Sequence, residues 1–144
     1  MSETAADTFQ FGFVCVQNAG RSQMSTAFAE REVERRGLGD RVEIATGGTH
    51  PADHVHEEVV TVMDELGIDL SDRTPREVST ETLNACDVVA TMGCSTLELD
   101  ADSVEVRDWA LDDPDGQDLD AVRAIRDEID ERVTALFDEF VDDA

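Results

Sequence analysis

A cysteine and an arginine with five residues between them, Cys15 and Arg21, bracket a short polar segment. Five short residues can curl so that successive backbone N–H groups point inward and bind an anion. The planar guanidinium of Arg21 can hold two oxygens of that anion, and the positive end of a following helix adds to the same field. That field also favours the thiolate form of Cys15, which is the nucleophilic form. The segment therefore predicts an oxyanion site with a cysteine nucleophile.

The residues inside the segment have types that suit such a loop. Gly20 permits a positive φ just before a helix, and Asn18 can hold the loop with its side chain or itself adopt a left-handed conformation. The bare Cys-x5-Arg spacing is a weak signal, because the chain contains three cysteines and 11 arginines; a buried, inert Cys15 is the alternative. The expected oxyanion-binding residues are Val16, Gln17, Asn18, Ala19, Gly20, Arg21 and Ser22.

The hydrophobic patterns around the segment place it between a strand and a helix. The pattern predicts strands at Phe11–Val16, Arg41–Thr46, Asp87–Met92 and Val104–Val106, and helices at Arg21–Arg36, Val55–Leu66, Thr80–Ala85 and Leu119–Phe140. This alternation is typical of an α/β fold: one doubly wound domain over residues 1–144, with a four-stranded parallel sheet and helices on both faces. Residues 1–10 are expected to be a loose lead-in. Ligands of such folds bind at the carboxyl ends of strands, so the site should form where the first strand ends.

Two further residues could take part in chemistry at that edge. Cys94 follows the third predicted strand, and neighbouring strand ends lie about 5 Å apart, so a flexible loop could bring its sulfur to Cys15 as a resolving thiol. A structural cysteine is the alternative. Asp113 lies before Pro114 in a turn; it could protonate a departing oxygen, although from the sequence alone a turn-forming role is the simpler interpretation. Cys86 precedes the third strand and should be buried and inert at the opposite end, with a redox role as the alternative.

The charge balance excludes several classes of protein. With 35 acidic and 11 basic residues the net charge is −24, which disfavours binding to nucleic acid or to an anionic membrane surface. An acidic face for a basic partner is one explanation, but the acids are spread along the chain, which favours a solvated coat suited to a salt-rich cytosol. No membrane span or secretion signal is visible, so we expect a cytoplasmic protein. The spacing of His50, His54 and His56 predicts no metal site.

Cys15-x-x-Asn18-x-x-Arg21-Ser22 resembles the low-molecular-weight protein tyrosine phosphatase superfamily, and more closely its arsenate reductase branch. The further motifs that resemble this branch are Ser22-Gln23-Met24, Gly48-Thr49-His50-Pro51-Ala52, Met63-x-x-x-Gly67-Ile68-Asp69-Leu70-Ser71, Thr91-Met92-Gly93-Cys94, Trp109-Ala110-Leu111-Asp112-Asp113-Pro114 and Arg123-x-Ile125-Arg126-Asp127-Glu128-Ile129. They span nearly the whole chain. Where the phosphatases usually have Ser-Pro-Met, this chain has Ser-Gln-Met.

The resemblance implies reduction of arsenate, with Cys15 as nucleophile, Arg21 as oxyanion ligand, Cys94 as resolving thiol and Asp113 as acid. It implies no bound cofactor and an external reductant, either thioredoxin-like or a small thiol. The chain departs from the family in having Gln17 where glycine is common and Gly20 where cysteine is common. It also lacks the additional cysteine that many relatives carry after the position of Cys94.

Two alternative functions remain open at this point. The same residues could hydrolyse a phosphomonoester, with water in place of Cys94, although the absence of tyrosine removes an aromatic rim for a phosphotyrosine ring. A non-catalytic anion sensor is the other alternative, and it would not need a nucleophile.

Overall fold

Four parallel strands form the sheet in the order β2-β1-β3-β4. The computed structural model describes residues 9–39, 41–92, 104–109, 111 and 116–140. The elements are β1 (Phe9–Cys15), α2 (Arg21–Arg36), β2 (Val42–Gly48), α3 (Glu57–Asp64), α4 (Thr80–Asn84), β3 (Val88–Met92), β4 (Glu105–Asp108) and α5 (Leu119–Phe140). The predicted doubly wound, four-stranded parallel sheet is therefore confirmed.

The position of β1 inside the sheet explains where a site can form. From β1 the chain crosses to β2 on one side, and β3 lies on the other side, so the strand order reverses at the carboxyl end of β1. At that end Cys15 pairs with Gly48 of β2 and with Met92 of β3. Cys94 comes two residues after Met92 in the chain but lies outside the described residues.

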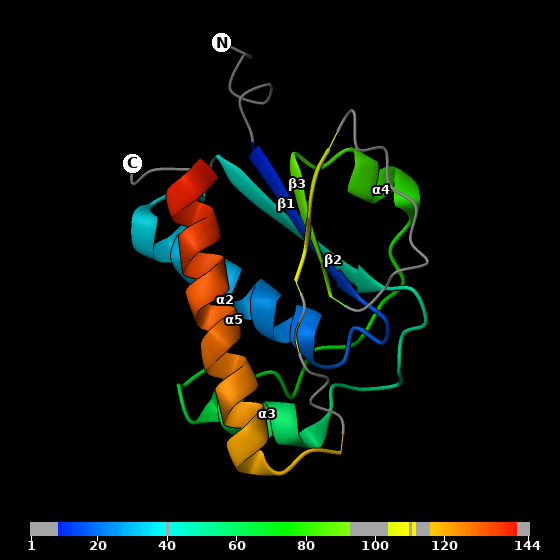
Figure 1. Cartoon of the computed structure of the whole chain (residues 1–144), viewed down its shortest axis with the longest axis vertical. Coiled ribbons are helices and arrows are strands. Elements are labelled where there is room, and N and C mark those ends of the chain that lie inside the picture. Colours follow the sequence, from blue (N-terminus) through cyan, green and yellow to red (C-terminus); the bar gives the residue numbers. More distant parts are fainter. Residues whose placement is uncertain (1–8, 40, 93–103, 110, 112–115, 141–144) are drawn as a thin grey trace.

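Helices cover both faces of the sheet (Figure 1). Because side chains alternate along a strand, Phe11 and Phe13 of β1 both point into the larger core, which contains residues of α2 and α5. There the ring centroids of Phe11 and Phe137 lie 4.8 Å apart. Val14 points to the other face and packs with Leu83 of α4. The two cores fix β1 from both sides and so fix the position of Cys15 at its end.

Several predicted boundaries need correction. β2 continues past the expected end at Thr46 to Gly48, and β4 covers Glu105–Asp108 instead of Val104–Val106. β1 begins at Phe9, so the last two residues of the expected lead-in belong to the sheet; the rest of it, residues 1–8, lies outside the described residues. The helix predicted over Val55–Leu66 is the shorter α3, and Leu66 is 44% exposed instead of continuing the apolar stripe. The chain turns after α3, where the Ile68 N–H bonds to the Met63 carbonyl and Gly67 has φ +79°.

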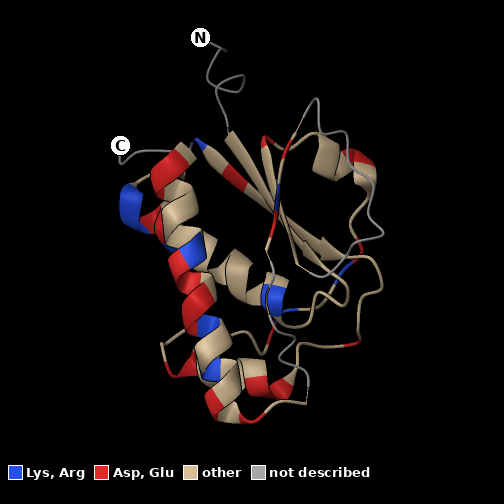
Figure 2. Ribbon diagram, viewed as in Figure 1, with Lys and Arg blue, Asp and Glu red and all other residues tan. Residues whose placement is uncertain are grey.

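The charged residues organise the helical side of the molecule. Figure 2 shows acidic residues along α3 and α5, with arginines among them. Arg36 of α2 bonds to Asp138 of α5 at 2.8 Å, and the same arginine holds the buried Glu32 at 3.0 Å. Within the part of the chain that the structure describes, no helix combines the length and apolarity needed to cross a membrane.

Candidate active site

The loop from Cys15 to Gly20 has every backbone carbonyl bonded to a donor outside the loop. Four of these donors are N–H groups of residues 49–56, which we call the latch segment. They donate to the carbonyls of Cys15, Val16, Gln17 and Ala19 at 2.7 to 3.2 Å, from Thr49, His50, Ala52 and His56. The Gly20 carbonyl accepts the first bond of α2, from Met24 at 3.0 Å, and the Asn18 carbonyl accepts from the side chain of Gln23 at 3.1 Å.

This pattern determines where the loop N–H groups point. In a planar trans peptide the N–H points opposite to the carbonyl, and the described residues contain no cis peptide. Because the carbonyls of residues 15, 16, 17 and 19 face the latch segment, the N–H groups that follow them point away from it. A loop with its carbonyls turned outward and its N–H groups on the other side is what an anion nest requires.

The amino end of α2 adds a positive field at the same place. Its N-cap residue, Gly20, makes no side-chain capping bond, and the first turn contains no acidic residue. In a chain with a net charge of −24, an uncompensated helix N-terminus is unusual and favours an anion. Gly20 has φ −142°, so the expected positive φ at this position was wrong; the left-handed residue is Asn18, with φ 51°.

Asn18 holds its left-handed conformation through a fully bonded side chain. It is completely buried, and its amide nitrogen donates to Ser22 Oγ at 2.7 Å and to Thr46 Oγ1 at 3.1 Å. Its amide oxygen accepts from the Arg76 N–H at 3.0 Å and from the Gln23 amide at 3.1 Å. These bonds compensate for the cost of a left-handed non-glycine residue, and both roles expected for Asn18 are present.

The thiol of Cys15 lies 3.0 Å from Ser22 Oγ and is 3% exposed. Ser22 Oγ already accepts a hydrogen bond from Asn18, so its own hydrogen can be directed at the sulfur. When Cys15 is a thiolate, Ser22 must be the donor of this pair. Ser22 is therefore placed to donate a hydrogen bond to a nucleophilic sulfur at this position.

Arg21 begins α2 and connects the loop to the segment before α5. Its Nη1 donates to the Leu111 carbonyl at 3.2 Å. Leu111 comes two residues before Asp113 in the chain, but Asp113 itself, like Cys94, lies outside the described residues. The structure thus brings Cys15 and Ser22 together and bonds Arg21 to Leu111, whereas the roles expected for Arg21, Asp113 and Cys94 stay predictions.

For several residues around the site the sequence analysis predicted no role there, although some belong to the quoted motifs: Gly48, Thr46, Gln23, Arg76 and the latch segment. A Cβ on Gly48 would come within 2.5 Å of the Val16 carbonyl oxygen and 2.9 Å of the Asn18 nitrogen, so only glycine allows β2 to approach the loop this closely. The second strand was expected to end before Gly47 and Gly48, and Gly48 was named only as part of a motif, with no role in the site. A glycine inside a strand also signals close backbone approach, and that signal could have identified them.

Cys86 lies at the other end of the sheet and in a different environment. It is 2% exposed and packs with Leu83 and Val89. Burial, with a smaller effect from the charge of Asp87, raises the pKa of its thiol to about 11. A thiol in that state is a poor nucleophile near neutral pH, which supports the expected inert role.

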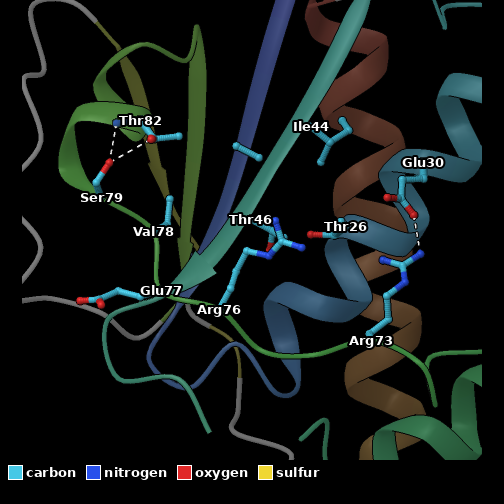
Figure 3. A pocket seen from close by; sticks show the side chains of 11 residues that line it. Thr26, Glu30, Ile44, Thr46, Arg73, Arg76, Glu77, Val78, Ser79 and Thr82 are labelled. Carbon is cyan, nitrogen blue, oxygen red and sulfur yellow. Dashed lines mark hydrogen bonds and ion pairs between the residues drawn. The ribbon is translucent and has the colours of Figure 1, made fainter. Parts of the chain in front are cut away.

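A pocket of about 580 Å³ lies behind the loop, between α2, the edge strand β2 and residues 73–79. Figure 3 shows the Arg76 side chain extending toward Thr46 and Thr26, while Glu77 points away from them. Arg73 is paired with Glu30 at 2.7 Å. Cys15 and Arg21 do not line this pocket, but Thr46 and Arg76, which both bond to the Asn18 side chain, do. Among the described residues no group of three or more His, Cys, Asp or Glu side chains is arranged to hold a metal ion.

Comparison with known proteins agrees with this geometry. A model of the family described as low molecular weight phosphotyrosine protein phosphatase matches residues 10–144. A protein of Halobacterium salinarum that carries the provisional name of an arsenate reductase is 76% identical over 137 residues, which are 95% of this chain and 96% of that protein.

Two solved structures of arsenate reductases share the fold over nearly the whole of this chain. A thioredoxin-dependent arsenate reductase of Corynebacterium glutamicum superposes with a TM-score of 0.77 at 32% identity, over 94% of this chain and 63% of that one. An arsenate reductase in its phosphate-binding state superposes with a TM-score of 0.78 at 29% identity, over 92% of this chain and 98% of that one. Because the family model covers nearly the whole chain, this chain belongs to the low-molecular-weight phosphotyrosine protein phosphatase family.

Proposed function

We propose that the protein is an arsenate reductase that binds arsenate in the Cys15–Arg21 loop. The observation that carries the proposal is the loop itself, whose carbonyls are all bonded outward while its N–H groups and the uncapped end of α2 remain for an anion. The identity to the Halobacterium salinarum protein supports arsenate as the oxyanion. The phosphate-binding state of a similar reductase supports a tetrahedral anion in this loop.

The first chemical step is attack of the Cys15 thiolate on arsenic. A sulfur–arsenic bond forms, and one arsenic–oxygen bond breaks. Asp113 donates the proton that lets this oxygen depart as water. Arg21 and the loop N–H groups hold the remaining oxygens, where negative charge is concentrated. The bond between Arg21 and the Leu111 carbonyl supports this assignment, since it connects the loop to the segment that carries Asp113.

The second step reduces arsenic. The Cys94 thiolate attacks the sulfur of Cys15, a disulfide forms, and the two electrons of the sulfur–arsenic bond remain on arsenic, which leaves as arsenite. Cys15 is paired in the sheet with Met92, two residues before Cys94, which supports Cys94 as the resolving thiol. The disulfide must then be reduced by an external dithiol or small thiol, and the thioredoxin-dependent relative supports the former.

The setting we propose for this chemistry is a reducing, salt-rich cytoplasm. Reduced thiols persist in the cytoplasm, where a thiol reductant is also available. The high acidic excess suits concentrated salt, because screening removes the self-repulsion of the surface.

Hydrolysis of a phosphomonoester is the competing function, because the matching family is described by that activity and the loop would bind phosphate equally well. It would use Cys15, Arg21 and Asp113 with water in place of Cys94. The chain contains no tyrosine to form a rim around an aromatic ester, which favours the reductase.

The two functions are separated by Cys94→Ser, measured in high salt beside the wild type. Stoichiometric arsenate should remove two free thiols from the wild type, and a peptide map should join Cys15 to Cys94. Cys94→Ser should lose multiple turnover with arsenate but keep aryl phosphate hydrolysis at the wild-type rate. Cys86→Ser is the matched control and should retain turnover. A disulfide that contains Cys86, or no loss of thiols, would refute the proposed transfer from Cys15 to Cys94 and would favour phosphatase activity as the function.

A further inference from the structure

Gln23 bonds to the carbonyl of Asn18, which with that of Gly20 is one of the two loop carbonyls that the latch segment does not reach. Asn18 is left-handed, so its carbonyl is turned away from residues 49–56 and toward α2. There the Gln23 side-chain amide nitrogen lies 3.1 Å from the Asn18 carbonyl oxygen and 3.1 Å from Asn18 Oδ1. Gln23 is 3% exposed, so solvent does not supply an alternative donor.

The surrounding bonds dictate which end of the Gln23 amide faces the loop. The Arg76 backbone N–H can only donate, so the side-chain atom of Asn18 that faces it must be the oxygen Oδ1 and not the nitrogen. The Asn18 carbonyl is an acceptor as well, so Gln23 faces two acceptors and must present its NH₂ group to both. A carboxylate or an apolar side chain of similar size cannot replace this group.

We propose that Gln23 is a positioning residue for the oxyanion. Its amide holds the Asn18–Ala19 peptide in the orientation that turns the carbonyl toward α2 and the Ala19 N–H to the opposite side. If that peptide rotated, a carbonyl oxygen would replace an N–H donor on the anion side, and repulsion would replace attraction. The other carbonyls of the loop are held by backbone donors, so this is the only one that depends on a side chain among the six from Cys15 to Gly20.

A purely structural role for Gln23 makes a different prediction from a positioning role. A structural residue would lower the melting temperature, while the folded protein would still bind anions with wild-type affinity. A positioning residue changes the affinity of the folded protein itself. The inference rests on the oxyanion-binding part of the proposed function, and phosphate binding by the wild type tests that part separately.

The experiment measures the phosphate dissociation constant of Gln23→Met and of Gln23→Glu. Phosphate is titrated, and the slowing of Cys15 alkylation reports how much of it is bound. Gln23→Met keeps the size and removes the donor, and it should raise the phosphate dissociation constant about tenfold, the effect of about one buried hydrogen bond. Gln23→Glu has the same shape as glutamine but places a carboxylate against two acceptors, and it should weaken binding further. The KM for arsenate should rise in the same order.

Gln10→Met is the matched control, since it removes a glutamine hydrogen bond, to Glu43 at 3.4 Å, from the far end of β1. It should leave the phosphate dissociation constant unchanged. Wild-type affinity in both Gln23 variants, with only a lower melting temperature, would overturn the proposal. Failure of both variants to fold would overturn it too, because the role of Gln23 would then be in forming the fold. Wild-type protein without phosphate protection would instead refute the proposed function.

Discussion

Cys15 and Cys86 are buried to the same extent but lie in opposite environments. They are 3% and 2% exposed, respectively, and both lie at the sheet. Cys15 has Ser22 Oγ at 3.0 Å and belongs to a loop that faces the N-terminus of α2. Cys86 packs among apolar side chains, and its sulfur donates only to the Thr82 carbonyl at 3.5 Å.

The comparison teaches that exposure alone does not decide the reactivity of a thiol. Burial without polar partners penalises the thiolate, and for Cys86 the pKa rises to about 11. At Cys15 the burial is the same, but a hydroxyl can donate to the sulfur and the helix field favours negative charge. The two ends of the sheet therefore differ in the polar groups supplied by the neighbouring segments.

The largest effect is expected from the thiols themselves. Cys15→Ser should abolish arsenate reduction and ester hydrolysis, by about 10⁴-fold or more, because the nucleophile is lost. In the wild type, alkylation near pH 7 should modify Cys15 quickly, and arsenate or phosphate should slow it, whereas Cys86 should react only when the protein opens. Peptide mapping after brief alkylation checks both expectations. Equal rates at the two cysteines, or rates that ignore both anions, would contradict the comparison.

A pair of glycine-to-alanine substitutions tests whether the Cys15 and Cys86 ends of the sheet respond differently to an added methyl group. In Gly48→Ala the new Cβ would come within 2.5 Å of the Val16 oxygen, so the loop must shift. A strain of about 1–3 kcal/mol at the site should lower kcat/KM about tenfold or more. In Gly12→Ala the new Cβ would lie 3.1 Å from Leu83 Cδ2 and 3.2 Å from Cys86 Sγ. This variant should lower the stability of the protein and leave kcat/KM unchanged. Steady-state kinetics and thermal melts separate the outcomes. The comparison fails if Gly12→Ala impairs turnover as strongly as Gly48→Ala.

Salt should act on the two thiols differently. With a net charge of −24, raising salt from low to molar concentration should raise the melting temperature by about 10 °C, because screening weakens the self-repulsion of the surface. Cys86 reacts only through opening, so its alkylation should slow as stability rises. Cys15 reacts in the folded protein and should not slow by the same factor. A melting temperature independent of salt would be incompatible with the salt-adapted surface.

The smallest expected effect is on stability in acid, and it should not change the reactivity of Cys15 or Cys86. Hydrogen bonds from Arg123, and then from Arg126, hold the pKa of Glu65 below its ordinary value of 4.5. Its stabilising contribution is therefore complete above about pH 4.5 and is lost as the pH falls through the lower pKa of the folded state. Glu65→Gln should make acid unfolding less steep, with Cys15 alkylation at pH 7 unchanged. Parallel acid titrations of the wild type and the variant, followed by circular dichroism, measure this difference; identical curves would show that Glu65 contributes nothing.

The elements that carry the site were predictable from local patterns. The apolar run before Cys15 and the helical stripe after Arg21 define β1 and α2 within a few residues, because a buried strand and an amphipathic helix each impose their own period. The position of a site at the end of β1 follows from these elements, since parallel strands with helical crossovers place loops at their carboxyl ends. The inert environment of Cys86 also follows from its place before β3.

The shape of the loop was decided by contacts between distant parts of the chain. The latch segment lies more than 30 residues after the carbonyls it bonds, and Arg76 is 58 residues from Asn18. No local pattern encodes such pairs, so the sequence suggested a positive φ at Gly20, whereas long-range bonds place the left-handed residue at Asn18. Residue types and spacing thus determined that a cysteine and an arginine flank a loop at the sheet edge. Only the tertiary structure decided which way each peptide of that loop faces, because a peptide turns toward whichever donor the folded chain brings beside it.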